Sequence, residues 1–119
     1  MEIKRWSGGT QGRSTASAYA GLLWLVSNAS DVSGDFCSQT LETFALLDTT
    51  LQKAGSSRKR LLSVQVLLAD IAMKPVFDIL WKEWIGTEPT GWPQRACFQV
   101  GLTPGLLIEI TAVATRDEA

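Results

Sequence analysis

Two charged residues lie inside sequence segments that are otherwise typical of buried strands. Arg95 lies within segment 92–100, WPQRACFQV, and Glu109 lies within segment 106–114, LLIEITAVA. Burying an unpaired charge is costly, so two such residues indicate either an ion pair or a functional site. A guanidinium on a rigid strand can bind a small carboxylate through two hydrogen bonds, and a neighbouring carboxylate can orient or deprotonate a water molecule.

The short link between these segments, GLTPG at 101–105, predicts an antiparallel hairpin. Strand alternation would then place Arg95, Cys97, Glu109 and Thr111 on one face of the sheet. In the simplest register, Cys97 faces Glu109 and Arg95 lies diagonal to it, within reach of a long side chain. From periodicity alone, a structural ion pair between two strands and a functional site remain equally good interpretations.

The rest of the chain predicts the elements that must position these residues. Apolar residues at helical spacing predict two amphipathic helices, and apolar or alternating runs predict three further strands. The expected helices cover 36–53 and 73–86, and the expected strands cover 1–6, 22–26 and 61–70. This order favours an α+β fold in one domain, residues 1–119, in which two helices pack on one face of a mixed sheet.

The run 22–26, LLWLV, is apolar at every position, which predicts a strand buried on both faces. Two helices cover only one face of a sheet, so the other face would stay open in a single chain. We therefore expect the chain to associate with further copies of itself through the sheet.

The composition argues against several classes of partner. The 119 residues are 45% hydrophobic and 19% charged, with a formal net charge of -1, so no excess of basic residues favours nucleic acid or an anionic membrane. The single basic run, Arg58 to Arg60, is expected in a solvated loop. No segment is typical of a signal peptide or a membrane span, and we expect a cytoplasmic protein.

The absence of histidine limits the possible chemistry. It excludes Ser-His-Asp and Cys-His dyads and histidine-ligated zinc, and two isolated cysteines, Cys37 and Cys97, cannot complete a thiolate metal site. We expect both cysteines to be buried free thiols. The run SGGTQG lacks the spacing of a phosphate-binding or dinucleotide-binding loop, so neither a metal nor a cofactor is expected.

Several motifs in a fixed order resemble one known family. They are GLLWLVSN at 21–28, KAGSS at 53–57, LLAD at 67–70, WPQRAC at 92–97 and LLIEITAVA at 106–114. Over residues 12–114, their order and spacing resemble the reactive intermediate deaminase family, also called the Rid or YjgF family. WPQRAC stands in place of the family's Pro-x-Arg-x-Cys, and LLIEITAVA in place of its final strand.

The resemblance implies a chorismate-mutase-like α+β fold that assembles as a homotrimer, with sites at the subunit clefts. It implies that Arg95 binds the carboxylate of 2-aminoacrylate or a related imino acid. Glu109 would help a water molecule to add to the imine carbon, which releases ammonia and a 2-keto acid. Cys97 would lie near the ligand, and Ser27 and Asn28 would correspond to a Ser-Gly loop that lines the pocket.

Some positions depart from the family pattern, and these departures concern the substrate more than the fold. Ser14 stands where a tyrosine often bounds the pocket, Asn28 replaces a glycine, and Asp78 replaces an asparagine. Such changes could admit larger imines. Trp92 could line the cleft or pack at a subunit boundary, and Arg13 beside Ser14 is expected to be solvated. Two further tryptophans, Trp81 and Trp84, lie on the apolar face of the second helix and are expected in the core.

Three functions remain open from the sequence. The first is an enamine or imine deaminase that uses Arg95 and Glu109. The second is a binding or regulatory protein on the same scaffold, in which Arg95 captures 2-keto acids without turnover. The third is a purely structural trimer. Only catalysis requires the glutamate, and the presence of both residues favours the enzyme.

Overall fold

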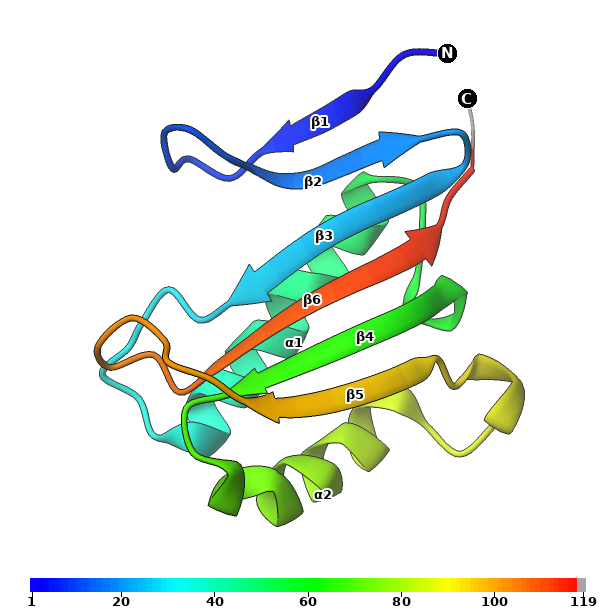
Figure 1. Ribbon diagram of the computed structural model, residues 1–119. Coiled ribbons are helices and arrows are strands. Elements are labelled where there is room, and N and C mark those ends of the chain that lie inside the picture. Colours follow the sequence, from blue (N-terminus) through cyan, green and yellow to red (C-terminus); the bar gives the residue numbers. More distant parts are fainter. Residues whose placement is uncertain (118–119) are drawn as a thin grey trace.

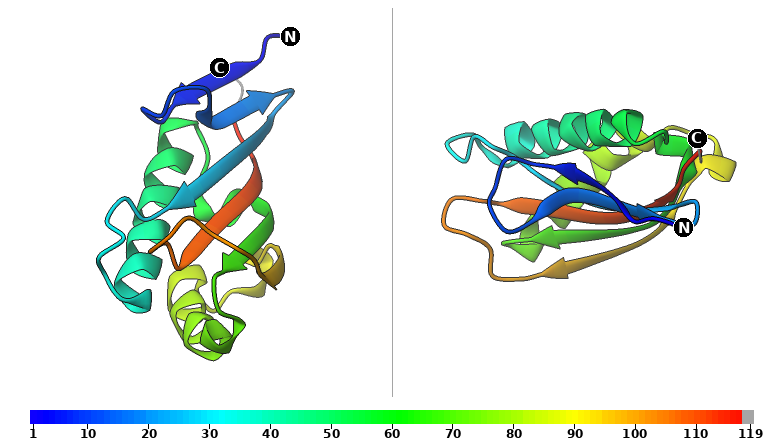
Figure 2. Two further views of the ribbon diagram at one scale, coloured as in Figure 1. Left: turned by 60° about the vertical axis from the view of Figure 1, so that its left-hand side comes forward. Right: turned by 90° about the horizontal axis from the view of Figure 1, so that it is seen from above.

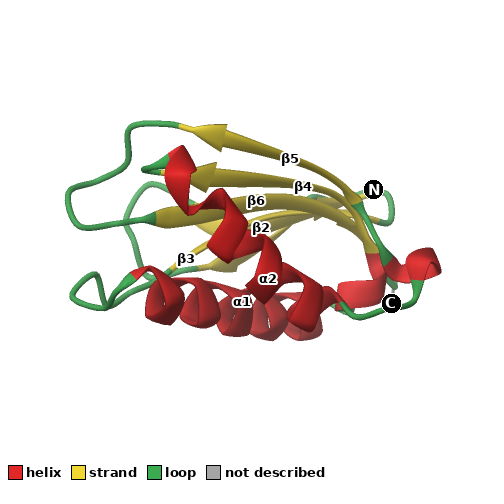
Figure 3. Cartoon of the chain, turned by 90° about the horizontal axis from the view of Figure 1, so that it is seen from below, coloured by secondary structure: helices red, strands yellow, loops and turns green. Residues whose placement is uncertain are grey.

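A mixed sheet with two helices on one face forms the fold, as the computed structural model of residues 1–117 shows (Figure 1, Figure 3). The strand order is β1-β2-β3-β6-β4-β5, in which β4 and β5 are parallel and the other neighbours are antiparallel. This arrangement confirms the predicted α+β class. The strands are β1 (Lys4–Ser7), β2 (Ser14–Tyr19), β3 (Leu22–Asn28), β4 (Leu61–Leu68), β5 (Gln94–Gln99) and β6 (Ile108–Thr115), and the helices are α1 (Phe36–Lys53) and α2 (Lys74–Ile85).

Both helices begin and end where the sequence predicts. The carboxylate of Asp35 accepts a 2.8 Å hydrogen bond from the Ser38 amide and caps α1. The glycine after α1, Gly55, adopts φ 78°, and Gly86, which follows α2, adopts φ 86°. These left-handed conformations favour glycine and end the helices. Pro75 occupies the first turn of α2, where its missing N–H costs nothing.

The helices bury their apolar faces against the sheet and against each other. Phe44, Leu47 and Leu51 of α1 are buried, as are Phe77 and Trp81 of α2. The Phe44 ring stacks on Trp84 with a centroid distance of 4.6 Å, and the other aromatic pairs are tilted. Both expected core tryptophans therefore lie where the helical spacing places them.

A buried glutamine ties α1 to the loops at one end of the sheet. The side-chain amide of Gln39, which is 1% exposed, donates to the carbonyl oxygens of Gly34 and Gly105 at 3.1 and 2.9 Å. Its carbonyl oxygen accepts a 2.9 Å hydrogen bond from the Leu107 amide. These bonds fix the start of β6, the strand that carries Glu109.

Strand β2 is absent from the sequence-based expectation. Its buried positions are Ala16 and Ala18, whose small side chains give little apolar signal. They pack on the helix side of the sheet, opposite Leu25 and Leu23 of β3. The structure thus has one more strand before α1 than the apolar pattern indicates.

The second face of the sheet is open in the single chain (Figure 2). Leu23 and Leu25 are buried toward the helices, whereas Trp24 between them is 45% exposed. Phe98 of β5 is 49% exposed. The prediction that 22–26 is buried on both faces is therefore wrong for one chain, because only one side of the sheet carries helices.

The predicted hairpin between the last two strands is also wrong. Strand β5 pairs in parallel with β4, and β6 lies between β3 and β4. Helix α2 provides the crossover that a parallel pair requires, and the link 101–105 belongs to the chain segment that passes from β5 across β4 to β6.

Two smaller expectations also need correction. The basic run 58–60 forms a short 3-10 helix, in which Arg58 pairs with Asp48 at 2.9 Å, so it is not a solvated loop. Both cysteines are free as expected, but Cys37 is exposed and Cys97 is only partly buried. Among residues 1–117, no helix is long and apolar enough to cross a membrane.

Candidate functional site

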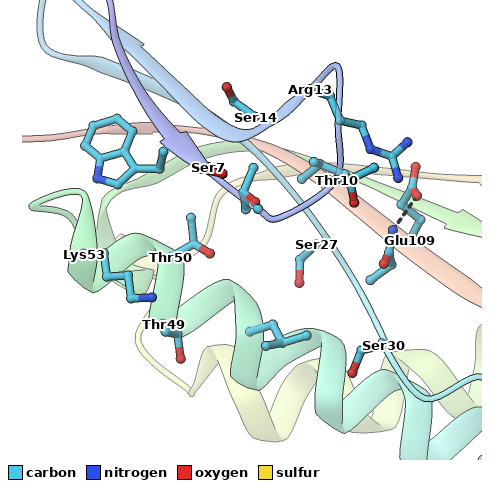
Figure 4. Close-up of a pocket in the computed structure, with 16 residues that line it drawn as sticks. Ser7, Thr10, Arg13, Ser14, Ser27, Ser30, Thr49, Thr50, Lys53 and Glu109 are labelled. Atoms are coloured by element: carbon cyan, nitrogen blue, oxygen red, sulfur yellow. Dashed lines mark hydrogen bonds between the residues drawn. The ribbon is translucent and has the colours of Figure 1, made fainter.

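A large cavity lies where strands β2 and β3 separate. Their pairing covers Ala16–Tyr19 and Leu22–Leu25 and does not continue to Ser14 or to the end of β3. A cavity of about 900 Å³ occupies the resulting gap beside α1 (Figure 4). It is rich in hydroxyl groups and is lined by Trp6, Ser7, Gly8, Thr10, Arg13, Ser14, Thr15, Val26, Ser27, Asn28, Ser30, Leu46, Thr49, Thr50, Lys53 and Glu109.

Glu109 is the one carboxylate among the lining residues, and its neighbour on β3 holds it in place. Asn28 and Glu109 are directly paired across β3 and β6. The Asn28 side-chain amide donates a 2.9 Å hydrogen bond to Oε1 of Glu109, which Figure 4 marks with a dashed line. This bond fixes the orientation of the carboxylate and leaves Oε2 available to a water molecule or ligand.

Hydroxyl groups from the strands and from α1 form the walls. The Ser27 hydroxyl donates a 2.8 Å hydrogen bond to the Thr43 carbonyl oxygen, so it anchors β3 to α1 at the cavity. Thr49 and Thr50 line the helix side. Ser14, at the start of β2, lines the opposite side, so a small residue leaves space where a larger one would fill it.

The loop between β1 and β2 carries Arg13 into the cavity. The loop includes Gly9 and Gly12 at φ 84° and φ 90°, and neither has a heavy atom within 4 Å of an added Cβ. Arg13 and Glu109 both line this cavity, as Figure 4 shows. Within residues 1–117, Arg13 forms no ion pair within 4.0 Å.

Arg95 lies on the other face of the sheet. It is aligned with the buried Val64 of β4 and faces α2, whereas Glu109 lies between the buried Ile108 and Ile110 and faces away from the helices. The prediction that Arg95 and Glu109 share a face is therefore wrong. It depended on a β5–β6 hairpin that does not form.

The Arg95 guanidinium is paired with Asp78 and packs against two aromatic rings. Nη2 donates a 2.8 Å hydrogen bond to Asp78, and the group lies 5.3 and 5.2 Å from the ring centroids of Phe77 and Trp81. Its side chain is 20% exposed. Burial opposes ionisation of Asp78, but hydrogen bonds from Lys74 and Arg95 outweigh it and lower the pKa of Asp78.

Two further expected site residues also lie away from the cavity. Cys97 is on the same strand face as Arg95, where burial raises the pKa of its thiol and the positive charge of Arg95 only partly offsets this. The Trp92 indole donates to the Gly86 carbonyl oxygen at 2.9 Å and is largely exposed. Neither residue lines the cavity around Glu109.

The cavity thus brings together four of the expected residues, namely Ser14, Ser27, Asn28 and Glu109, and separates them from Arg95, Cys97 and Trp92. Sequence reasoning favoured solvation for Arg13, which is exposed but also lines the cavity. The sequence signal that could have placed Arg13 at the site is its position directly before Ser14, which was expected there. Nothing in the pattern of α1 indicates that its polar residues 49, 50 and 53 line a site. Over the described range, no group of three or more Cys, Asp or Glu residues could hold a metal ion.

Comparison with known proteins defines the family. The model of the family described as "Endoribonuclease L-PSP" matches residues 3–116. The chain therefore belongs to this family, which is the Rid/YjgF family. A YjgF family member from Neisseria meningitidis has the same fold, with a TM-score of 0.88, 25% identity and coverage of 100% of this chain and 98% of that chain. An uncharacterized protein from Pseudomonas aeruginosa gives a TM-score of 0.87 at 29% identity, over 98% of this chain and 100% of that chain.

Curated relatives are similar over a shorter part of the chain. The 3-aminoacrylate deaminase RutC of Acinetobacter baylyi is 35% identical over 82 residues, which are 68% of this chain and 63% of the relative. A RutC family protein from Haemophilus influenzae is 33% identical over 65% of this chain and 66% of its own length. The matches thus span slightly less than two thirds of each of these relatives.

Proposed function

We propose that this protein hydrolyses 2-imino acids, including the imine tautomers of 2-aminoacrylate-type enamines, to 2-keto acids and ammonia. Glu109 would orient and deprotonate the attacking water. The observation that carries the proposal is a fixed carboxylate in a polar cavity, with Asn28 holding one oxygen at 2.9 Å and the other left for water. The relative named as a 3-aminoacrylate deaminase supports the same chemistry.

The reaction needs only acid–base chemistry. Glu109 accepts a proton as the water oxygen bonds to the imine carbon, and the C=N electron pair moves to nitrogen, which becomes protonated. Glu109 returns its first proton to that nitrogen, and the resulting carbinolamine then collapses: Glu109 takes the hydroxyl proton and passes it to the amine nitrogen as the C–N bond breaks, so ammonia leaves and Glu109 is again a carboxylate. No oxidant or reductant is required. A positioned general base typically contributes about 10²- to 10⁴-fold, which suits a substrate that already hydrolyses readily.

We further propose that the protein functions as a homotrimer joined through the open face of the sheet. The support is the exposure of Trp24 and Phe98 on a face that no helix covers. Within one chain, Arg95 and Glu109 lie on opposite faces. Arg95 could therefore take part in this reaction as a residue of a neighbouring copy, with the N–H groups that do not bond Asp78.

The test replaces Glu109 and measures both products. We expect the wild type to accelerate ammonia and keto-acid release from imines that an amino-acid oxidase generates in situ. Glu109→Gln preserves the shape but removes the base, so the rate should fall at least about 100-fold. Glu83→Gln, at an exposed position of α2, is the matched control and should retain full activity.

The main alternative is a protein that binds 2-keto acids without turnover. It predicts no acceleration by the wild type, together with keto-acid binding that Glu109→Gln leaves intact. A purely structural trimer predicts neither binding nor turnover. Measuring turnover and binding on the same samples therefore separates the three functions.

A further inference from the structure

We infer that the cavity also holds the side chain of its substrate, and that this side chain has an apolar body of ring size with a hydroxyl group at its tip. The inference rests on the proposed function for the imino-acid part of the substrate and adds the class of side chain. Its support is a set of three hydroxyl groups on the α1 side of the cavity, those of Ser27, Ser30 and Thr49 (Figure 4).

The cavity is larger than the reacting part of the substrate requires. Its volume is about 900 Å³, which is near the upper end of the range for pockets that bind drug-sized molecules. An imino acid as small as that derived from 2-aminoacrylate would leave most of this volume to water. The cavity therefore has room for a large side chain in addition to the group that reacts at Glu109.

The cavity reaches both faces of the sheet. Glu109 faces away from the helices, whereas Ser27 lies on the helix side of β3, where its hydroxyl bonds the Thr43 carbonyl oxygen of α1 at 2.8 Å. The pairing of β2 with β3 ends before Ser27, which leaves a gap between the two strands. A substrate with its imine carbon at Glu109 can therefore extend its side chain through this gap toward α1.

The three hydroxyl groups on the α1 side have already donated their protons. Those of Ser27 and Thr49 donate to carbonyl oxygens of α1 at 2.8 and 3.0 Å, and that of Ser30 donates to the Glu42 carboxylate at 2.6 Å. Hydrogen bonds from Ser30 hold the pKa of Glu42 below its usual value, so this carboxylate is ionised at neutral pH and cannot donate in return. The hydroxyl oxygens therefore offer only lone pairs to a ligand, and these bind an O–H or N–H group.

Charge and apolar surface narrow the kind of donor that fits. Arg13 and Lys53 also line the cavity and would repel an ammonium or guanidinium tip. A carboxylate tip has no proton to give to the hydroxyl oxygens. Trp6 and Leu46 add apolar surface to the walls. An uncharged hydroxyl group on an apolar ring matches both the lone pairs and the apolar surface.

Two keto acids that differ by a single hydroxyl group, 4-hydroxyphenylpyruvate and phenylpyruvate, are the probes. We expect the wild type to bind the hydroxylated acid about 3- to 10-fold more tightly, the range for one neutral hydrogen bond, as isothermal titration calorimetry can measure. This preference should disappear in Ser30→Ala/Thr49→Val or in Ser27→Ala, according to which oxygens bind the tip. Thr87→Val, at an exposed position outside the cavity, is the matched control and should keep the preference.

Melting temperatures confirm that each variant is folded before its affinities are compared. The double variant leaves the buried Ser27 unchanged, so it keeps the bond that ties β3 to α1. The inference is overturned if the wild type binds the two acids equally or binds neither of them. It is also overturned if the preference survives both in the double variant and in Ser27→Ala.

Turnover of the imines of tyrosine and phenylalanine, generated in situ by an amino-acid oxidase, separates this inference from the proposed function. If both imines are hydrolysed in a Glu109-dependent way with equal KM, the function stands and the side-chain site is wrong. If the hydroxylated acid is preferred through the three hydroxyl groups but no imine is turned over, the side-chain site stands and the deaminase proposal is wrong.

Discussion

The Asn28 side-chain amide donates a 2.9 Å hydrogen bond to the Glu109 carboxylate across paired positions of β3 and β6. Both residues line the cavity, so the bond orients the proposed base without blocking its second oxygen. A carboxylate that is free to rotate would spend less time in the geometry that water activation requires.

The first prediction concerns this bond. Asn28→Ala should lower kcat for imine hydrolysis by about 10-fold and leave KM nearly unchanged, because the amide orients the base and does not bind the carboxylate of the substrate. Asn28→Asp should be more damaging, since it places a second carboxylate against Glu109. Steady-state kinetics check the result, and melting temperatures confirm folding. A rise in KM with constant kcat would instead indicate that Asn28 contacts the substrate.

The second prediction concerns the ion pair between Asp78 of α2 and Arg95 of β5. In the folded chain the pKa of Asp78 lies below its ordinary value of 3.8. At a pH between the folded pKa and 3.8, the unfolded chain therefore binds more protons at Asp78 than the folded chain does. Stability consequently rises with pH over this range. The contribution should be complete above about pH 4 to 5 and lost as pH falls through the folded pKa. Asp78→Asn should be less stable by about 1–3 kcal/mol at neutral pH, because Arg95 and Lys74 lose their charged partner.

Urea unfolding at a series of pH values measures this effect. The difference in free energy of unfolding between wild type and Asp78→Asn should shrink toward zero in acid. A difference that stays constant with pH would show that packing, and not the charge of Asp78, accounts for the loss.

The third prediction concerns the Gln39 clamp, by which we mean the hydrogen bonds of the Gln39 side chain that hold the start of β6. Gln39→Leu removes hydrogen bonds to two loops and leaves the Gly105 carbonyl and the Leu107 amide without their partner. It should lower the free energy of unfolding by about 2–4 kcal/mol. Gln52→Leu, at an exposed position of the same helix, is the matched control. Equal unfolding midpoints for the two variants would contradict a structural role for the clamp.

The fourth prediction concerns self-association. Trp24→Lys places a charge on the open face of the sheet and should convert the proposed trimer to single chains of 13.0 kDa. Ile79→Lys, at an exposed apolar residue of α2, should leave the assembly intact. Sedimentation velocity measures the mass. A wild type that stays monomeric at high concentration, or a trimeric Trp24→Lys variant, would exclude this interface.

The helices were predictable because their signals are local. Residues three and four apart form the buried faces of α1 and α2, and Asp35, Gly55 and Gly86 mark where those helices begin and end. Strand β2 gave no such signal, because its two buried residues, Ala16 and Ala18, have small side chains that stand out little from their neighbours in hydrophobicity.

The relation between Arg95 and Glu109 could not be obtained from alternation alone. Period two assigns side chains to alternating faces of one strand, but the relative faces of two strands depend on which strands pair and in which register. The short link after β5 suggested a hairpin. The helix between β4 and β5 was the better guide, because strand–helix–strand order favours a parallel pair, and β6 then fills the position between β4 and β3.

The β1–β2 loop carries Arg13 but contributes no residue to the buried core. Substitutions of the exposed Thr10 and Arg13 should therefore act on the cavity wall with little effect on the fold, while Glu109 stays fixed by β3, β6 and the Gln39 clamp. The cavity is thus lined partly by sheet residues that also hold the fold, such as Ser27 and Glu109, and partly by loop residues that do not. The wall of the cavity can therefore be altered at Thr10 and Arg13 without replacing any residue of the buried core.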